Sequence, residues 1–540
     1  MVTLGLLFAG CGAEAPEPAV KPVAEVRIPE LGAPALLTRL SLDLRGVRPS
    51  EGEIARVEAD PGAVDVLIEQ FLQDPRFEER VIDLFAEVYL TRTENYIVDF
   101  SGLEVMYPAE ELLRSIGEEP LRIVAYVAMN DLPATDIVTG DWTMADEVLA
   151  SIYPLDYPPG ETGWKVAHYT DGRPAAGVLA TNGLWWRYQS SDSNANRKRA
   201  NATSRILLCH DYLTRPIDFD RNVNLLDEAA LTDALKANPG CVNCHSSLDP
   251  FAAYFYGFWW YGQTVAEMSM YHPAREQEWA DMLGTPPAYY GDPGSSLADL
   301  GWQVAGDNRF PECLAQRVTE GLLRRDATLG DFDQLVEHRE ALLSSGLKLR
   351  ALIRSVVESP EYRAAAAADL PAEAVPLKLA TPHLLASQVE DLTGFRWEYT
   401  GWDMLESDQV GFLTLAGGAD GVFTTRNATT TNPTLLLVQE RLAEAAASFV
   451  VANDQADLDH ARLFHHVDFT ETPDTGGAAM AAQVQELHLR VFGTRVSADG
   501  EEVNANLALW SDLYAVTGEA NAAWTGLLSA LLRDPDFVLY

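Results

Sequence analysis

Apolar side chains recur at helical spacing along most of the chain. Residues Ala63–Phe71 carry them three or four positions apart, as on one face of a helix, and Ser50 with Glu53 forms a capping box that predicts a helix start. The same spacing follows Pro75 and Pro311 and recurs over Leu347–Val357, Leu435–Val451, Val484–Val491 and Trp524–Leu532. Alternating runs typical of strands are short and few. The pattern therefore predicts a mainly α fold made of several helical subdomains.

Length and charge limit the classes of partner. The 540 residues carry 39 Lys and Arg against 80 Asp and Glu, a net charge of −41. Such a surface repels nucleic acid and anionic lipid headgroups, so we expect no nucleic-acid partner. It suits a cationic partner protein, although a large acidic surplus also serves solubility alone. A chain of this length is expected to hold about three or four domains or subdomains.

The N-terminus carries an apolar run that ends in small residues before Cys11. It resembles the end of a bacterial lipoprotein signal peptide, although no Lys or Arg precedes Cys11, so the true start could lie upstream of Met1. The Ala- and Pro-rich stretch Ala13–Glu30 would then be a flexible tether. We expect Cys11 to carry a lipid that anchors the protein to a membrane without spanning it. A chance cysteine in an ordinary apolar N-terminus is the alternative.

The run Cys241-Val-Asn-Cys244-His245 is the clearest chemical signal in the sequence. Two thiols on one helical turn reach the two vinyl groups of a porphyrin, and the next residue presents an imidazole to the iron. We therefore expect a covalently bound haem c, attached at Cys241 and Cys244, with His245 as a ligand of the iron.

Three alternatives to haem attachment have less support from the residues. A structural zinc site needs four ligands, and no second Cys pair or nearby His pair completes them. A thioredoxin-like redox pair would sit in a βαβ frame, which the pattern lacks, and it needs no following His. A disulfide between Cys241 and Cys244 would close a tight loop.

The second axial ligand of the iron cannot be identified from the sequence. Met268, Met270, His272 and Met282 follow the motif at plausible distances. Methionine would raise the reduction potential and favour electron transfer, histidine would lower it, and an open position would permit peroxidase or gas chemistry. The aromatic run Tyr254–Tyr261 could shield a porphyrin from water or belong to an ordinary core.

Other reactive residues leave alternatives open. Cys209 and Cys313 could form a disulfide in an oxidising compartment, but spacing alone does not decide it. The basic run Arg197–Arg199 is typical of a solvated helix face, with contact to haem propionates as the alternative. His460 and the pair His465–His466 lack supporting ligands nearby in sequence, so we expect a solvent-exposed pair rather than a metal site. The sequence contains no nucleophile-elbow, P-loop or zincin motif.

Several segments together resemble one family. Leu37–Ser50 and Phe71–Arg80 are similar to the opening of planctomycete-type cytochrome-c-like proteins, and Cys241–Pro250 is similar to their haem block, including Asp-Pro after the motif. Cys313–Arg325 and Leu487–Gly493 resemble their later helical blocks. The run after Pro250 is more aromatic than is usual in the family. The resemblance implies a large secreted haem protein and leaves the reaction undefined.

These observations predict six segments. They are a lipoprotein-type signal and tether (1–30), an N-terminal helical domain (31–95), a second helical block (96–165), a c-type haem-binding block (166–300), a helical block after the haem (301–368) and a C-terminal helical domain (375–540).

The expected function is that of an exported c-type cytochrome, with one haem, that exchanges electrons with a redox partner protein in the cell envelope, at the periplasm or outer membrane. The alternatives are a haem enzyme with an open iron site, for example peroxidase-like, and a surface protein of polymer degradation in which the haem is accessory.

Overall fold

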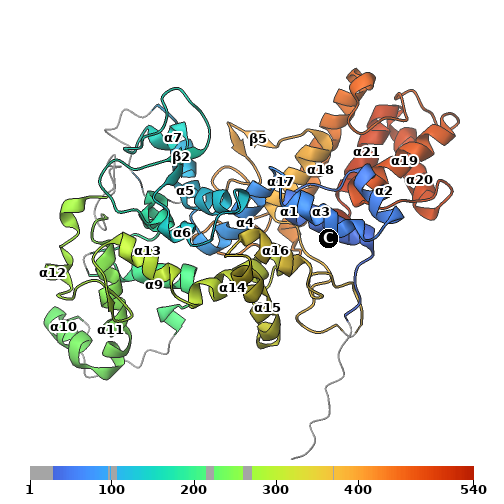
Figure 1. The fold of residues 1–540 in the computed structure, drawn as a ribbon. Coiled ribbons are helices and arrows are strands. Elements are labelled where there is room, and N and C mark those ends of the chain that lie inside the picture. The colour runs from blue at the N-terminus through green and yellow to red at the C-terminus, as the bar shows by residue number, and fades with distance from the viewer. Residues whose placement is uncertain are drawn as a thin grey trace, which may run out of the picture.

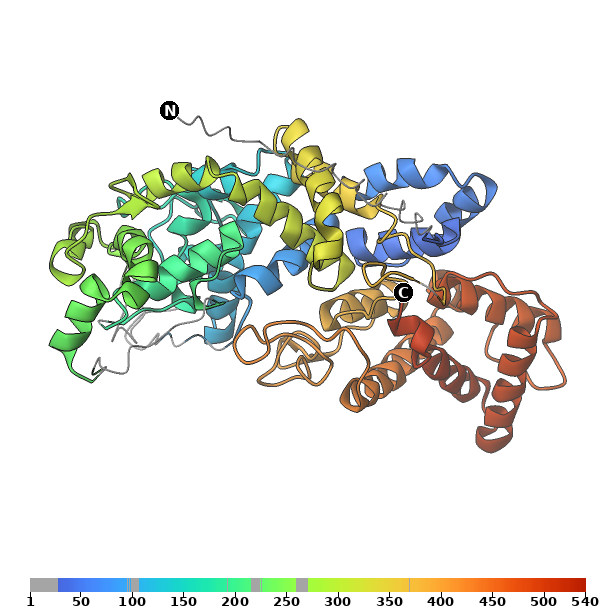
Figure 2. The ribbon, with the colours of Figure 1, turned by 90° about the horizontal axis from the view of Figure 1, so that it is seen from below.

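The computed structural model describes residues 28–94, 96, 98, 106–191, 193–214, 224, 226–258, 271–368 and 370–540. Within them the chain forms twenty-two α-helices and three two-stranded antiparallel sheets, which confirms the prediction of a mainly α fold. In both ribbon views the segments around α11 lie at one end of the molecule and the last helices at the other (Figures 1 and 2).

The N-terminal body comprises sixteen of the described helices. They are α1 (Ala33–Arg45), α2 (Glu51–Ala59), α3 (Ala63–Phe71), α4 (Phe77–Tyr89), α5 (Ala109–Met129), α6 (Asp136–Thr139), α7 (Glu147–Ala150), α8 (Asn182–Arg187), α9 (Arg197–Leu208), α10 (Glu228–Ala237), α11 (Pro239–Ala252), α12 (Trp279–Met282), α13 (Leu297–Ala305), α14 (Arg309–Leu323), α15 (Phe332–Ser344) and α16 (Leu349–Val357). Two short antiparallel sheets, β1 (Thr143–Ala145) with β2 (Lys165–Ala167) and β3 (Ala288–Tyr289) with β4 (Asp292–Pro293), belong to the same body.

The C-terminal body is a smaller helical bundle. Its elements are α17 (Pro382–Thr393), β5 (Glu398–Tyr399), β6 (Trp402–Asp403), α18 (Pro433–Ala456), α19 (Gly477–Phe492), α20 (Glu501–Thr517), α21 (Ala520–Leu532) and α22 (Pro535–Val538). The helices predicted from apolar spacing all form, and α3 has the predicted bounds. The predicted capping box also forms, since Glu53 accepts the backbone N–H of Ser50 at 2.8 Å and donates its own N–H to the Ser50 hydroxyl.

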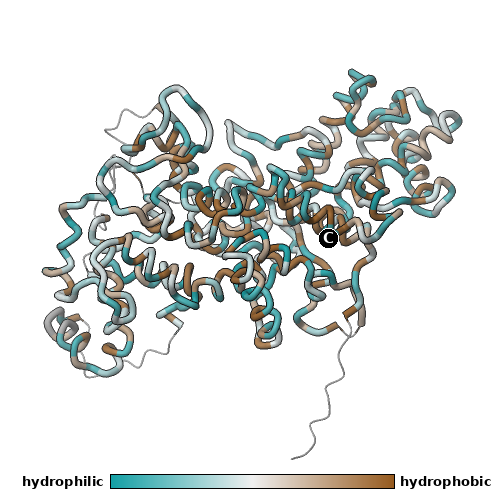
Figure 3. The backbone as a smooth tube through the Cα atoms, in the orientation of Figure 1, coloured by the Kyte–Doolittle hydropathy of each residue, from teal (hydrophilic) through white to brown (hydrophobic). Residues whose placement is uncertain are grey.

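Each body has its own hydrophobic core. One continuous cluster of buried apolar residues runs from Leu36 to Tyr362 and also includes Leu489 of the C-terminal body, and a second runs from Leu379 to Val538. Along the helices, hydrophobic and hydrophilic residues alternate (Figure 3), as expected for helices that bury one face. Among the described residues we find no helix with the length and apolar character that crossing a bilayer requires.

Helix α5 lies at the centre of the N-terminal body and brings a buried carboxyl group with it. A Cβ on Gly183 of α8 would come within 1.9 Å of the Ile116 carbonyl of α5, so glycine permits this close crossing. Glu119, one turn after Ile116 on α5, is fully buried. Its carboxyl group accepts hydrogen bonds from Tyr169 at 2.7 Å, Thr143 at 2.8 Å and the Asn182 backbone at 3.2 Å. Burial raises the pKa of Glu119 to about 7, although these donors and Arg173 oppose the shift.

Asp43 of α1 joins the two bodies. Its buried carboxylate pairs with Lys378, which precedes α17, and accepts the hydroxyl groups of Tyr362 at 2.6 Å and of the last residue, Tyr540, at 2.7 Å. Burial alone would raise the pKa of Asp43, but the charge of Lys378 and these hydrogen bonds lower it. Burial lowers the pKa of Lys378 to about 7, so the ion pair is complete on the acid side of neutrality. Four distant segments therefore meet at one carboxylate.

Replacing Lys378 with Met should destabilise the protein by about 3–5 kcal/mol at pH 6, because it leaves a buried charge without its partner. Adding Asp43→Asn should recover part of the loss, because the uncompensated charge is then gone. Chemical denaturation measures both changes. Lys165→Met is the matched control, since the Lys165–Glu161 pair is exposed and should contribute about 0–1 kcal/mol. An equal effect of the two lysine variants would contradict the role of the buried pair.

The raised pKa of Glu119 predicts a pH dependence of stability. The folded protein binds more protons than the unfolded chain between pH 4.5 and 7, so the free energy of unfolding should fall as pH rises through this window. The contribution is roughly 3 kcal/mol, and Glu119→Gln should remove it. Urea titrations of both proteins across the window test this. The exposed Glu337→Gln variant should keep the wild-type profile, and an unchanged profile in Glu119→Gln would refute the assignment.

Candidate functional site

The Cys-x-x-Cys-His run lies on helix α11. Pro239 occupies the first turn and the Asn238 side chain accepts the Gly240 backbone N–H at 3.0 Å, so the helix starts directly before the motif. Residues three and four positions apart share a helix face, which brings Cys241, Cys244 and His245 together. Both thiols are half-buried and neither forms a disulfide.

His245 is held by a carboxylate one turn further along the same helix. Its Nδ1 lies 2.8 Å from Oδ1 of Asp249. The guanidinium of Arg197, at the start of α9, grips that carboxylate with two hydrogen bonds, Nε to Oδ1 at 2.6 Å and Nη2 to Oδ2 at 3.0 Å. Burial alone would raise the pKa of Asp249, but the hydrogen bonds from Arg197 and His245 lower it. Asp249 is therefore an anion placed behind the imidazole.

These groups fit covalent haem attachment. Two unpaired thiols on one face of α11 meet the need for two thioether bonds. Because Asp249 engages Nδ1 of His245, the other ring nitrogen, Nε2, is left to bind a metal, and a carboxylate partner of this kind is usual for metal-ligating histidines. Across the described residues no group of three or more His, Cys, Asp and Glu side chains is placed to hold a metal ion.

Aromatic residues that follow the motif pack into the core behind α11. Phe251, Phe255 and Phe258 are all completely buried, and Trp185 of α8 lies 4.7 Å from the Phe255 ring, measured between centroids. Tyr254 donates its hydroxyl hydrogen to Gln303 at 2.7 Å. The described part of the run, residues 254–258, is thus buried. The rest of the predicted aromatic stretch, residues 259–261, lies outside the described residues.

The basic run on α9 is not the solvated face that the sequence suggested. Only Lys198 is exposed. Arg199 is fully buried and donates to the carbonyl oxygens of Tyr188 and Phe258, at 3.3 and 3.4 Å. Arg197 is committed to Asp249. The run faces inward because α9 packs against both α11 and α14, a contact that charge patterning along one helix does not reveal.

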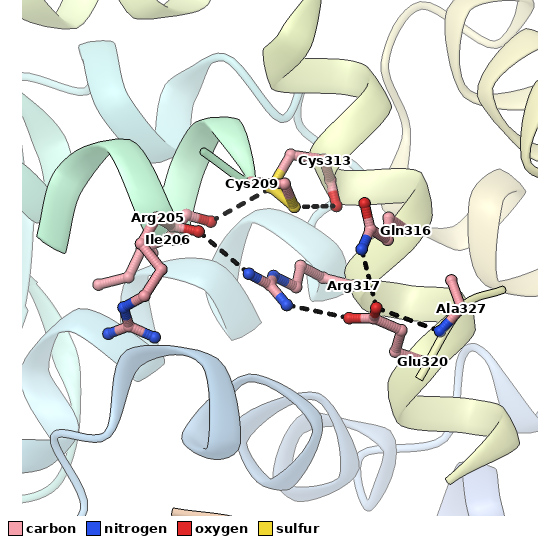
Figure 4. The surroundings of a disulfide bond; sticks show 8 residues. All are labelled: Arg205, Ile206, Cys209, Cys313, Gln316, Arg317, Glu320 and Ala327. Carbon is pink, nitrogen blue, oxygen red and sulfur yellow. Dashed lines mark hydrogen bonds and ion pairs between the residues drawn. A yellow bond between two sulfur atoms is a disulfide. The ribbon is translucent and has the colours of Figure 1, made fainter. Parts of the chain in front are cut away.

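Cys209 and Cys313 form a disulfide bond, which the sequence had left open. It links the residue after α9 to α14, with the two Cα atoms 5.2 Å apart (Figure 4). Beside it, Arg317 of α14 donates to the Arg205 carbonyl at 3.1 Å and to Glu320 at 2.9 Å. The helix that carries Arg197 is therefore fastened at its far end.

The remaining candidates are the lipidation residue Cys11 and the possible second axial ligands of the iron. Cys11, Met268 and Met270 lie outside the described residues. His272 is half-buried at the start of a short 3₁₀ turn, with its backbone N–H bonded to the Gly257 carbonyl at 2.7 Å, and Met282 ends α12 with 42% of its surface exposed. The second axial ligand stays unassigned, with Met268, Met270, His272 and Met282 as the candidates.

The histidine pair in the C-terminal body is solvent-exposed, as expected. His465 and His466 keep 43% and 46% of their side-chain surfaces exposed. Both contact the carboxylate of Glu486, which is distant in sequence, at 2.5 and 3.2 Å. His460 pairs separately with Asp457 at 3.0 Å.

A cavity, which sequence reasoning missed, lies where the two bodies meet. A cavity of about 700 Å³ opens between the end of α4, the start of α5, the end of α14 and the loop from β6 to α18. Charged groups in its wall pair with each other, as Arg324 does with Glu87 at 2.7 Å. Glu94 receives the backbone N–H groups of Asp408 and Gln409 at 3.0 and 2.9 Å, which ties the loop to the N-terminal body. The lining residues come from separate segments, so no local signal marks them.

Comparison with known proteins identifies no relative. No family model matches the chain, and searches of curated proteins and of solved structures found no match. The resemblance to planctomycete-type cytochrome-c-like proteins stays a prediction.

Proposed function

We propose that this protein is an exported c-type cytochrome that binds one haem through Cys241 and Cys244 and transfers electrons to or from a partner protein. The observation that carries the proposal is the different state of two cysteine pairs. Cys209 and Cys313 are joined, whereas the motif cysteines are free thiols on one face of α11 beside an imidazole with one nitrogen available. When bound there, haem supplies a one-electron iron couple.

Export agrees with the same cysteines. Disulfides persist in oxidising compartments such as the bacterial periplasm, so the Cys209–Cys313 bond supports a location outside the cytoplasm. A lipid on Cys11 would anchor the protein at the periplasm or the outer membrane surface. The resemblance of Cys241–Pro250 to the planctomycete-type haem block points the same way.

The surface charge suggests the kind of redox partner. A net charge of −41 attracts cations over the whole surface and accelerates encounters with a positively charged protein at low salt. The motif helix lies at one end of the elongated molecule (Figure 1), and its cysteines and histidine are half-buried rather than enclosed. A partner that docks at this end would meet the haem edge.

Replacing Cys241 and Cys244 together with Ser should abolish covalent haem, because no thioether bond can form. The protein is produced with a periplasmic haem-attachment system, and haem is detected by peroxidase staining of denaturing gels and by the pyridine haemochrome spectrum. The double variant Cys209→Ser, Cys313→Ser is the matched control. It should keep covalent haem while losing about 2–5 kcal/mol of stability. Staining of the Cys241, Cys244 variant at wild-type intensity would defeat the proposal.

A six-coordinate electron-transfer haem should not bind carbon monoxide readily, because a second axial ligand occupies the iron. Reduced protein should therefore give the same visible spectrum before and after addition of CO. An immediate spectral change would favour the alternative of a haem enzyme with an open iron site. With an open iron site, substitution of His272 or Met282 should leave the haem spectrum unaltered. With a six-coordinate haem, substitution of the residue that is the second axial ligand should allow CO to bind.

A further inference from the structure

We propose that Arg197 and Asp249 set the reduction potential of the iron bound by His245, with Asp249 lowering it and Arg197 moderating that effect. The inference rests on the proposed function and assigns a positioning role to two residues that the attachment motif itself does not contain.

The geometry is a chain of three side chains from two helices. Oδ1 of Asp249 lies 2.8 Å from Nδ1 of His245 and 2.6 Å from Nε of Arg197, so one oxygen serves both donors. The other oxygen takes a second bond from Arg197 at 3.0 Å, which completes a bidentate clamp. His245 and Asp249 are four residues apart on α11 and so lie on the same face, while Arg197 reaches them from α9.

This chain is shielded from water. The side chains of Arg197, Asp249 and His245 keep only 18%, 17% and 22% of their surfaces exposed. Charges interact more strongly in such surroundings than in bulk water. A unit change of charge at Asp249 or Arg197 should therefore act on the imidazole with less screening than in bulk water.

The effect on the iron follows from the charges. A carboxylate that accepts the Nδ1–H hydrogen bond fixes the tautomer with Nε2 free and makes the imidazole a stronger donor. A stronger donor favours iron(III) over iron(II), which lowers the potential of the one-electron couple. Arg197 draws electron density from the same oxygen and so weakens this effect. The two residues thus act in opposite directions through one atom.

The fold keeps the clamp in place. Arg197 is the first residue of α9, and its Nη1 also donates to the Ser193 carbonyl at 3.4 Å. The opposite end of α9 is joined to α14 by the Cys209–Cys313 disulfide. The disulfide therefore limits movement of α9, which carries Arg197, relative to α14.

The test is a potentiometric titration of the haem-loaded protein and its variants. Asp249→Asn should raise the midpoint potential, because the imidazole loses its anionic partner. Arg197→Gln should lower it, because the carboxylate then acts without its counter-charge. The potentials should follow the order Asp249→Asn, wild type, Arg197→Gln, from highest to lowest. Shifts of the same sign in both variants would overturn the proposal.

Two controls separate the clamp from general charge effects. Lys198→Gln removes a neighbouring positive charge that is exposed, and it should leave the potential close to wild type. Arg197→Gln should shift the potential less in the Asp249→Asn background than in the wild type, because the route through the carboxylate is gone. Equal shifts in the two backgrounds would show that Arg197 acts through space alone.

Haem content distinguishes failure of the proposed function from failure of the role proposed for Arg197 and Asp249. The pyridine haemochrome spectrum measures covalent haem in every variant before titration. Absence of haem from the wild type would refute the proposed function itself. Normal haem content with potentials in the wrong order would refute only the clamp, and thermal unfolding of the variants checks that each one folds. If Asp249→Asn does not fold, the comparison of Arg197→Gln with Lys198→Gln decides, and equal potentials there would refute the clamp.

Discussion

A single buried carboxylate, that of Asp43, holds the two bodies of the molecule in register. It receives Lys378 from the segment before α17 and hydroxyl groups from Tyr362 and Tyr540, so α1, the end of the N-terminal body and the last residue converge on it. Beside it, Arg39 donates to the carbonyl oxygens of Tyr362, Val375 and Pro376, which binds the linking segment to α1. Buried charges need such complete pairing, and the polar contacts tolerate few alternative arrangements.

The candidate haem site is supported by other contacts, which are the packing of α11 on α9 and the Cys209–Cys313 disulfide. It lies at the end of the molecule remote from the C-terminal bundle, where α11 packs on α9 and on the aromatic core below it. There the disulfide and the contacts of Arg317 fix α9 to α14, and α9 in turn supplies Arg197. The site therefore has a support of its own, and α14 also connects that support to the junction of the two bodies, because Lys378 donates to the Leu322 carbonyl of this helix at 3.2 Å.

The sequence predicts local features well and distant contacts poorly. Apolar spacing identifies α3, α16 and α18, and the capping box of Ser50 and Glu53 forms because both partners lie within one turn. The motif cysteines and His245 are placed by helix geometry alone. Even Asp249, four residues on, is within reach of such reasoning, since i to i+4 neighbours meet on any helix.

The hydrogen-bond and ion-pair partners of the functional residues come from distant parts of the chain. Arg197 precedes Asp249 by 52 residues, and Lys378 follows Asp43 by 335. Arg199 lies in a basic run that suggests solvent exposure, yet tertiary packing buries it. Glu119 looks like any helical glutamate until Tyr169 and Thr143 are seen around it. Only the assembled fold decides these pairings.

The disulfide also bears on how the chain would mature under the proposed export to an oxidising compartment. Of the four cysteines that follow Cys11, Cys209 would leave the translocation pore first, and both motif cysteines would follow it before Cys313. An oxidase that joins cysteines in their order of appearance would link Cys209 to Cys241 and consume a sulfur atom that haem attachment needs. Each of the three complete pairings of these four cysteines consumes both motif sulfur atoms, including the one that contains the Cys209–Cys313 bond. Correct assembly would then depend on the relative rates of thiol oxidation and haem attachment, because both reactions use the sulfur atoms of Cys241 and Cys244.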